Sequence, residues 1–226
     1  MKKLVVLSGA GMSAESGIST FRDSGGLWEG HDVMEVASPE GFKKNPELVL
    51  NFYNLRRKNL LDAHPNLGHN LLADLEKDFD VQIITQNVDD LHERAGSTKV
   101  LHLHGELFKV RSTGKDPSSI SWQKDLKLGD KCKDGFQLRP DIVWFGEMVP
   151  AMDEAIEICK QADIFVIIGT SLVVYPAAGL VNYVPKATAK FIIDPKIPYL
   201  SKDIFCIEEG ASIGVKKLIE HLKDLQ

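Results

Sequence analysis

The chain has 226 residues, 43% of them hydrophobic and 26% charged, which is the composition of a soluble globular protein with ample length to bury a core. The formal net charge of −5 gives no general attraction to nucleic acid or to an anionic membrane, so we expect neither as a partner. No apolar run approaches the roughly 20 residues that span a bilayer, and an apolar strand is expected almost from Met1. Together with three widely spread cysteines, this leads us to expect a cytoplasmic protein without a disulfide framework.

A glycine motif follows the first apolar run. The spacing Gly9-x-Gly11-x-x-Ala14 fits the dinucleotide fingerprint, in which glycines permit a tight turn and let backbone N–H groups and a helix N-terminus approach a pyrophosphate. An ordinary strand-to-helix turn is the alternative. The fingerprint also expects an acidic residue closing a second strand about 20 residues further on, but Glu29 and Asp32 lie in no apolar run. The motif therefore does not indicate a plain dehydrogenase half.

Residues 38–79 have helical periodicity throughout, and Pro46 suits the first turn of a helix. The expected apolar stripe comprises Leu48, Phe52, Leu55 and Leu60. Tyr53 and Arg56 are three residues apart and therefore share a helix face. From the charge pattern alone, a solvated basic patch of Arg56 with Arg57 and Lys58 is the alternative.

Short apolar runs alternate with helical segments along the chain. The runs are Leu4–Leu7, Val81–Ile84, Ile164–Ile168 and Phe191–Ile193. Each is short enough for a strand buried on both faces, so the alternation predicts an α/β fold with a parallel sheet wrapped by helices. Two stretches interrupt it: the helical residues 38–79, and the polar, irregular residues 107–139. The last segment, Ser212–Leu225, is expected to form a capping helix.

Polar residues follow the second of these strands. Gln86, Asn87 and Asp89 would lie at the carboxyl end of a parallel strand, where open α/β sheets bind ligands, although helix capping by Asn87 or Asp89 is the alternative. Gly169, Thr170 and Ser171 follow another strand and could hold ribose or phosphate oxygens, or cap a helix.

Two histidines, His102 and His104, alternate with leucines and are expected on the same strand face. They could bind a metal, but no third ligand is apparent. His104, at the strand end before Gly105, is the better candidate general base, since an unperturbed imidazole has a pKa near neutrality. A buried, hydrogen-bonded structural histidine fits His102 better.

Five segments in this order carry a family resemblance. They are GAGMSAESGISTFRDSGGLW at 9–28, TQNVDDLHERAG at 85–96, LHLHGE at 101–106, RPDIVWFGEMVP at 139–150 and GTSLVVYPAAG at 169–179. Together they resemble the sirtuins, which are NAD-dependent protein-lysine deacylases, over nearly the whole chain. The resemblance implies a Rossmann-like NAD-binding domain of residues 1–37, 80–106 and 140–226. It also implies a small domain made from the helical insertion 38–79 and a degenerate zinc-ribbon-like insertion 107–139.

By this resemblance NAD and an acyl-lysine of a protein meet between the two domains, His104 is the general base, and the products are nicotinamide, free lysine and O-acyl-ADP-ribose. The implied NAD contacts are Gly9, Ala10, Gly11, Ala14, Ile18, Thr20, Phe21, Arg22, Trp28, Gln86, Asn87, Asp89, Gly169, Thr170, Ser171, Asp194 and Ala211. Asp89 and the Ile18 backbone would hold the nicotinamide carboxamide.

Substrate contacts follow from the same resemblance. An extended edge formed by Val143, Trp144, Phe145, Gly146 and Glu147 would bind peptide by strand addition. Tyr53 and Arg56 are similar to the Tyr-x-x-Arg signature of sirtuins that accept succinyl- and malonyl-lysine, and Ala37 matches a small residue that widens the acyl pocket. The guanidinium would pair with the acyl carboxylate.

The sequence departs from the family in two places. Most sirtuins bind a structural zinc through four cysteines in the second insertion, but this insertion has only Cys132, with Ser112 where a cysteine would stand. Because a structural zinc site takes four Cys or His ligands, we predict no zinc. The insertion should then depend on packing of Trp122, Leu126, Leu128 and Phe136. Near the adenosine, Ile192 replaces a usual asparagine, which leaves Asp194 to bind the ribose alone.

Three alternatives stay open. The chain could be a deacetylase only, an ADP-ribosyltransferase or NAD glycohydrolase with the same NAD pocket, or a catalytically idle NAD-sensing module. We expect a monomer.

Overall fold

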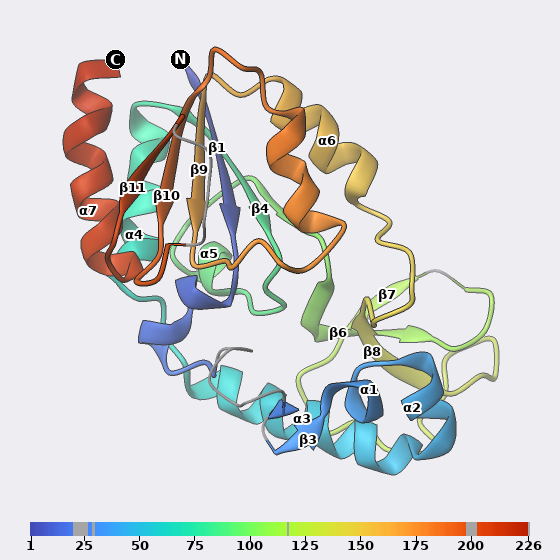
Figure 1. Ribbon diagram of the computed structural model, residues 1–226. Coiled ribbons are helices and arrows are strands. Elements are labelled where there is room, and N and C mark those ends of the chain that lie inside the picture. Colours follow the sequence, from blue (N-terminus) through green and yellow to red (C-terminus); the bar gives the residue numbers. More distant parts are fainter. Residues whose placement is uncertain (20–26, 29, 117, 198–202, 226) are drawn as a thin grey trace.

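The computed structural model describes residues 1–19, 27–28, 30–116, 118–197 and 203–225. Its large domain is built on a six-stranded, fully parallel sheet in the order β11-β10-β9-β1-β4-β5, with β1 and β9 near the middle (Figure 1). The strands are β1 (Lys3–Ser8), β4 (Asp80–Thr85), β5 (Val100–His102), β9 (Ile164–Ile168), β10 (Ala189–Ile193) and β11 (Ile204–Ile207). The predicted α/β fold with a Rossmann-like sheet is confirmed, and all four predicted strands are present.

Helices cover both faces of this sheet because successive residues of its strands point to opposite sides. Leu4 and Val6 of β1 face α4 (Leu67–Asp74) and α7 (Ala211–Leu222). Val5 and Leu7 face α6 (Met152–Lys160) and the 3-10 helix η4 (Ala177–Tyr183). The predicted capping helix is thus α7, extended by η5 (Lys223–Leu225). No helix in the described part of the chain is long and apolar enough to cross a membrane.

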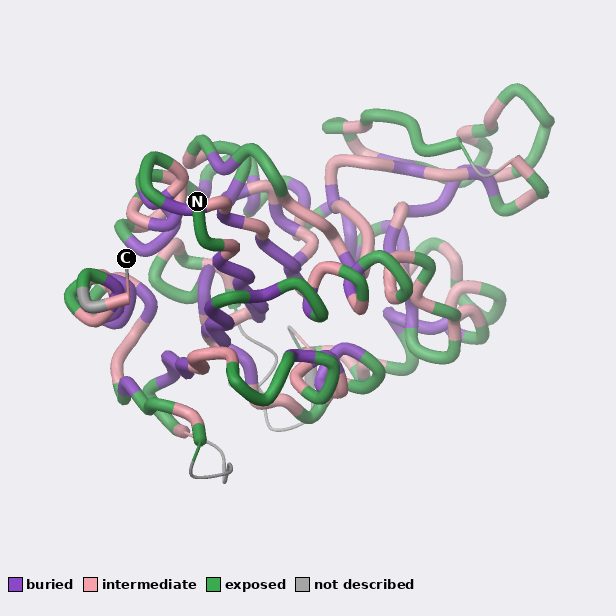
Figure 2. Tube along the Cα trace, turned by 90° about the horizontal axis from the view of Figure 1, so that it is seen from above, coloured by how far each residue is buried: buried purple, intermediate pink, exposed green. Residues whose placement is uncertain are grey.

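The small domain lies beside the carboxyl edge of the sheet (Figure 1). It contains α1 (Val33–Val36), α2 (Pro39–Lys44), α3 (Pro46–Asp62) and an antiparallel sheet of β7 (Ser119–Ser121), β6 (Gly105–Ser112) and β8 (Leu138–Ile142) in that order. The remaining short elements are β2 (Leu27–Trp28), β3 (His31–Asp32), η1 (Ala10–Met12), η2 (Ala14–Ser16), η3 (Leu75–Lys77) and α5 (Leu91–Arg94). Figure 2 shows buried residues concentrated in the central sheet and the tip of the second insertion largely exposed.

The helical insertion differs from the sequence expectation in its second half. Helix α4 packs on α7, and Leu72, Leu75 and Phe79 belong to the core under the large sheet. Of the expected insertion 38–79, only α2 and α3 therefore lie in the small domain, and α1, which belongs to the residues 1–37 expected in the NAD-binding domain, packs with them. The reason is that residues 67–79 carry their own apolar face, which the large sheet buries.

The buried face of α3 is also different from the expected stripe. Leu55 is 53% exposed, while Arg57 is 1% exposed, so the solvated basic patch with Arg57 is wrong. Burial of Arg57 is possible because its Nε donates to the Leu107 carbonyl at 3.1 Å and its Nη1 donates to Asn54 Oδ1 at 2.8 Å. A buried cation with these partners can replace an apolar residue on a core face.

The second insertion packs through fewer of the expected residues. Leu126 is buried with Leu50 and Val110, and Trp122 packs against this cluster, but Leu128 and Phe136 are about half exposed. The expected contribution of those two side chains is therefore wrong.

The turn at residues 133–135 of this insertion is stabilised by hydrogen bonds to the carboxylate of Asp134. This carboxylate accepts hydrogen bonds from Ser112 Oγ at 2.7 Å, from the Phe136 N–H at 3.0 Å and from the Cys132 thiol. Within the described residues no group of three His, Cys, Asp or Glu could hold a metal ion, and the absence of zinc stays a prediction.

Candidate active site

The loops after β1 and β9 interlock at the carboxyl edge of the sheet. The Gly9 N–H donates to the Ile168 carbonyl and the Gly11 N–H to the Gly169 carbonyl, both at 2.9 Å. A Cβ on Gly11 would lie 2.7 Å from Gly169 Cα, and Gly169 has a φ of +62°. These glycines are thus required for contact between the two loops, besides leaving backbone open to a ligand.

The chain after Gly9 does not enter an α-helix as the fingerprint expects. It forms the 3-10 helices η1 and η2, and η2 ends at Gly17 with φ +82°. Glycine and serine have low helix propensity, and a glycine in this left-handed conformation ends a helix. Over the described residues 9–19 the motif is therefore followed by no α-helix, and the expectation of an α-helix N-terminus beside the pyrophosphate is wrong there.

Asn87 and Asp89 turn back from the loop after β4 onto Ser13. Ser13 Oγ donates to Asp89 Oδ2 at 2.9 Å, and Asn87 Nδ2 donates to Ser13 Oγ at 3.0 Å. Burial raises the pKa of Asp89, and hydrogen bonds from the Leu91 N–H and from Ser13 oppose that rise. Asp89 Oδ1 accepts from the Leu91 N–H at 3.2 Å, but the N-cap of α5 is Asp90 and no side-chain hydrogen bond caps this helix, so the capping alternative does not hold for Asp89.

The other predicted cofactor residues gather at the same edge. Gln86 Nε2 donates to Thr170 Oγ1 at 3.1 Å, which links the loops after β4 and β9. Asp194 is buried at the end of β10, and Ala211 is buried at the start of α7. Four separate loops thus bring polar groups and glycines to one place, as ligand sites in open α/β sheets require.

Three predicted cofactor residues lie outside the described residues: Thr20, Phe21 and Arg22. Two others lie toward the small domain. Trp28 packs edge-on against Phe52, with ring centroids 5.3 Å apart, and Ile18 packs against the same apolar cluster. The cofactor roles of Trp28 and Ile18 stay predictions.

The two histidines are in different surroundings. His102 Nε2 lies 2.7 Å from Glu93 Oε1, and its pKa is raised because this hydrogen bond and the Glu93 charge outweigh burial. His104 Nδ1 lies 3.1 Å from the Gln86 carbonyl, and burial lowers its pKa. A carbonyl only accepts, so Nδ1 of His104 carries the proton and Nε2 keeps a lone pair. This is the state a general base requires, and it supports His104 over His102 for that role.

Residues 143–147 do not form the expected extended edge. Phe145 and Gly146 form a turn, and hydrogen bonds inside the protein engage the N–H groups of Val143, Trp144, Phe145 and Glu147. Strand addition needs free backbone groups in extended chain, and these four N–H groups already have partners inside the protein.

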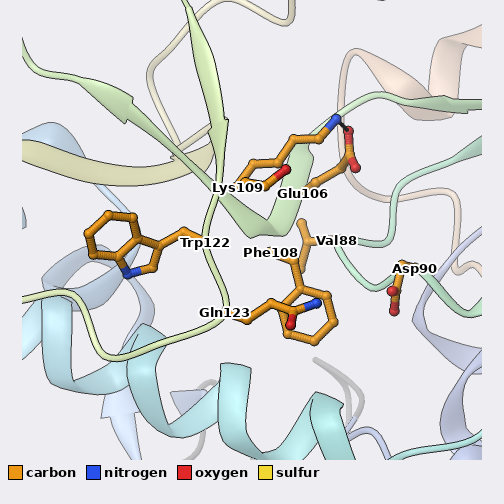
Figure 3. Close-up of a pocket in the computed structure, with 8 residues that line it drawn as sticks. Val88, Asp90, Glu106, Phe108, Lys109, Trp122 and Gln123 are labelled. Carbon is orange, nitrogen blue, oxygen red and sulfur yellow. Dashed lines mark hydrogen bonds and ion pairs between the residues drawn. The ribbon is translucent and has the colours of Figure 1, made fainter. Parts of the chain in front are cut away.

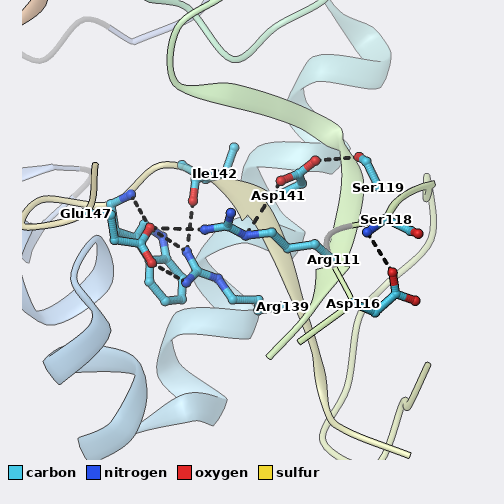
Figure 4. A network of polar contacts seen from close by, with 9 residues as sticks. Arg111, Asp116, Ser118, Ser119, Arg139, Asp141, Ile142 and Glu147 are labelled. Carbon is cyan, nitrogen blue, oxygen red and sulfur yellow. Dashed lines mark hydrogen bonds and ion pairs between the residues drawn. The ribbon is translucent and has the colours of Figure 1, made fainter. Parts of the chain in front are cut away.

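Glu147 instead stabilises this turn (Figure 4). Its carboxylate accepts from Arg139 at 2.6 and 3.1 Å, from Arg111 at 3.2 Å and from the Trp144 N–H at 2.8 Å. The Arg139 guanidinium also lies 3.3 Å from the Trp144 ring centroid. Glu147 therefore positions Trp144, while its own side chain is occupied by these internal partners.

Tyr53, Arg56, Ala37 and Trp144 come together next to this turn. Tyr53 is fully buried, and its hydroxyl oxygen accepts from Trp144 Nε1 at 3.0 Å. Arg56 lies with its guanidinium carbon 4.1 Å from the Trp28 ring centroid and 5.9 Å from that of Tyr53. Ala37 is buried in the same cluster, and its carbonyl accepts from the Phe145 N–H. The predicted acyl-binding residues thus form one group.

A separate cavity of about 360 Å³ lies between the β4–α5 loop and the small domain (Figure 3). Its walls are Val88, Asp90, Glu106, Phe108, Lys109, Ser121, Trp122 and Gln123. None of these is a predicted site residue, and Lys109 pairs with Glu106 inside it.

Sequence reasoning missed Ser13 as a site residue. It is fully buried and bonds both Asn87 and Asp89. A small hydroxyl inside the glycine loop was the available signal, but its partners are more than 70 residues away in the chain.

Comparisons with known proteins identify the family of the chain. Residues 9–176 match the model of the Sir2 family. The chain is 59% identical to an NAD-dependent protein deacylase of Helicobacter pylori, over 100% of this chain and 99% of that protein. It is also 59% identical to one of Bacteroides thetaiotaomicron, with 96% and 97% covered.

Solved structures agree as well. A Sir2 homologue in complex with NAD matches with a TM-score of 0.89 and 42% identity, over 99% of this chain and 90% of that one. Sir2 bound to acetylated peptide matches with a TM-score of 0.81 and 32% identity, over 96% and 92%. The chain therefore belongs to the Sir2 family, and the resemblance to sirtuins is confirmed.

Proposed function

We propose that this chain, an NAD-dependent protein deacylase of the Sir2 family, removes succinyl and malonyl groups as well as acetyl groups from protein lysines. The observation that carries the proposal is the group formed by Tyr53 and Arg56 beside Trp144. It supplies a cation and a neutral hydroxyl donor to one apolar cluster.

Tyr53 is prepared to donate a hydrogen bond. Its oxygen already accepts from Trp144, so its own hydrogen is directed elsewhere. Burial raises its pKa to about 12, which keeps the hydroxyl protonated at neutral pH. A carboxylate at the end of an acyl chain would accept this hydrogen and pair with the Arg56 fork through charge-assisted hydrogen bonds. An acetyl group has no such carboxylate and would use the apolar cluster alone.

His104 acts on the ribose in the same reaction. After the acyl oxygen has displaced nicotinamide from C1′, a ribose hydroxyl must lose its proton so that its oxygen can attack the imidate carbon. The lone pair on His104 Nε2 can take this proton because Nδ1 is held by the Gln86 carbonyl. Asp89 and Asn87 are the polar groups available for the nicotinamide carboxamide.

The assay follows nicotinamide release and peptide mass with NAD and acetyl-, succinyl- or malonyl-lysine peptides. We expect each of the three peptides to cause nicotinamide release, in an amount that matches the amount of peptide that has lost its acyl group. Nicotinamide release without peptide would indicate an NAD glycohydrolase, and loss of acetyl groups alone would indicate a deacetylase. No nicotinamide release with any peptide would indicate an NAD-sensing module. Each of these results would contradict the proposal.

Arg56→Met tests the acyl contact. Losing a charge-assisted pair should lower kcat/KM for succinyl peptide about 100-fold and leave acetyl peptide within about threefold. Lys58→Met, an exposed cation on the same helix, is the matched control and should leave all three activities within about twofold. Equal losses on succinyl and acetyl peptides would refute the assignment.

A further inference from the structure

Two buried histidines lie under the site and outside the chemistry described so far. His69 on α4 is 0% exposed and His92 on α5 is 1% exposed. Their ring centroids are 4.9 Å apart, at an interplanar angle of 63°. Because burying imidazoles has a cost unless their polar atoms are used, this pair calls for a physical reason.

Their hydrogen bonds define which nitrogen carries each proton. His69 Nδ1 accepts from the Asn66 N–H at 3.3 Å, so in the neutral ring its Nε2 is protonated. Ser8 Oγ donates to Thr85 Oγ1 at 2.9 Å and therefore accepts from His92 Nε2, 3.0 Å away, which leaves a lone pair on His92 Nδ1.

The remaining two nitrogen atoms are complementary. Both His69 Nε2 and His92 Nδ1 are buried without a hydrogen-bond partner among the described residues. One is a donor and the other an acceptor, on rings that already touch. Burial lowers the pKa of His69 to about 4 and that of His92 well below its usual value, so both rings are neutral at physiological pH.

A continuous chain of hydrogen bonds leads from His92 to the site. Ser8 Oγ, which accepts from His92, donates to Thr85 Oγ1, and Thr85 Oγ1 also accepts from the Asn87 N–H at 3.0 Å. Asn87 in turn donates to Ser13, and Ser13 to Asp89.

The chain closes on its other side through the helix cap of α4. Asn66 Nδ2 donates to the Met12 carbonyl at 2.8 Å, next to Ser13. Polar contacts thus run from His92 to Ser13 on one side of the end of β1, and from His69 through Asn66 to Met12 on the other. The two series come together where the rings of His69 and His92 are in contact.

We propose that His69 and His92 are positioning residues, which hold Asn87 and Asp89 in the orientation that binds the nicotinamide end of NAD. The inference rests on the NAD-dependent deacylase activity but not on the acidic-acyl preference. It is therefore tested with acetyl-lysine peptide, and wild-type activity on that peptide is the internal check that separates the two proposals.

The test uses Ser8→Ala, which cuts the chain with a small change of volume, together with His92→Leu and His92→Gln. Glutamine keeps an amide N–H donor at a similar distance along the side chain and should restore function. We expect Ser8→Ala and His92→Leu to raise KM for NAD and the inhibition constant of nicotinamide about tenfold, with KM for peptide within about twofold. Calorimetric titration with NAD should show the same weakening without catalysis.

Ser97→Ala is the matched control, because Ser97 is a buried serine in the loop after α5 whose hydroxyl has no hydrogen-bond partner among the described residues. It should leave both constants unchanged. If His92→Leu does not fold, Ser8→Ala decides. Unchanged NAD and nicotinamide constants in Ser8→Ala, equal changes in NAD and peptide constants, or no rescue by a folded His92→Gln would each overturn the proposal.

Discussion

At the residue scale, His102 and His104 show how environment divides two similar side chains. The sequence predicted both on one face of a single strand, which is wrong, because β5 ends at His102 and His104 lies in the bend before β6. The better candidate base was predicted from its position before Gly105. What the sequence could not provide was the partner of His102, because Glu93 lies in a different element and reaches it only in the folded chain. That partner raises the pKa of His102, whereas burial lowers the pKa of His104.

A pH dependence follows for His104. The base must be neutral, and its folded pKa lies below 6.5, so kcat/KM should be level near pH 7 and fall as the pH drops through a midpoint below 6.5.

His104→Ala should lower the rate of deacylation by about 100-fold or more but keep peptide-dependent exchange of labelled nicotinamide, since expulsion of nicotinamide precedes the base step. An acid limb centred above pH 6.5, or loss of exchange together with deacylation in a folded variant, would argue against this role.

At the scale of elements, α3 joins the two insertions through polar residues that no periodicity could predict. Asn54 Oδ1 accepts from the Leu126 N–H at 2.8 Å, and its Nδ2 donates to the Leu126 carbonyl at 2.9 Å. Hydrophobic spacing predicts which helices exist, as it did for α3 and α7. It cannot predict a buried Asn54 or Arg57, because their backbone partners lie 50 to 72 residues away.

Asn54→Ala should therefore destabilise the protein. It would leave the N–H and carbonyl of Leu126 buried without their partner, at a cost of about 2 kcal/mol or more in the free energy of unfolding. Urea denaturation measures this cost, and Asn51→Ala, an exposed asparagine on the same helix, should stay within about 0.5 kcal/mol of the wild type. Similar stabilities of the two variants would mean that α3 does not anchor the second insertion through Asn54.

At the scale of the whole molecule, the parallel sheet decides where function lies. Its strands end at one edge, so the glycine loop, the Gln86–Asp89 loop and the Gly169–Ser171 loop meet there although they are far apart in sequence. This much followed from short apolar runs and the residues after them. The interlock of Gly11 with Gly169 did not, because it depends on backbone contact between two loops and leaves no pattern in either one.

The chain as a whole is expected to fold without metal. A structural zinc contributes folding free energy directly, so its removal would unfold the second insertion. Here Asp134 joins Ser112 and Cys132 by hydrogen bonds, and Leu126 packs beneath them. We expect purified protein to contain far less than one zinc per chain, and EDTA to leave its melting temperature and deacylation unchanged.

Asp134→Ala should lower the melting temperature, whereas Lys133→Ala, at an exposed neighbouring position, should not. Stoichiometric zinc, or a melting temperature that falls with EDTA, would show that ligands outside this cluster hold a metal.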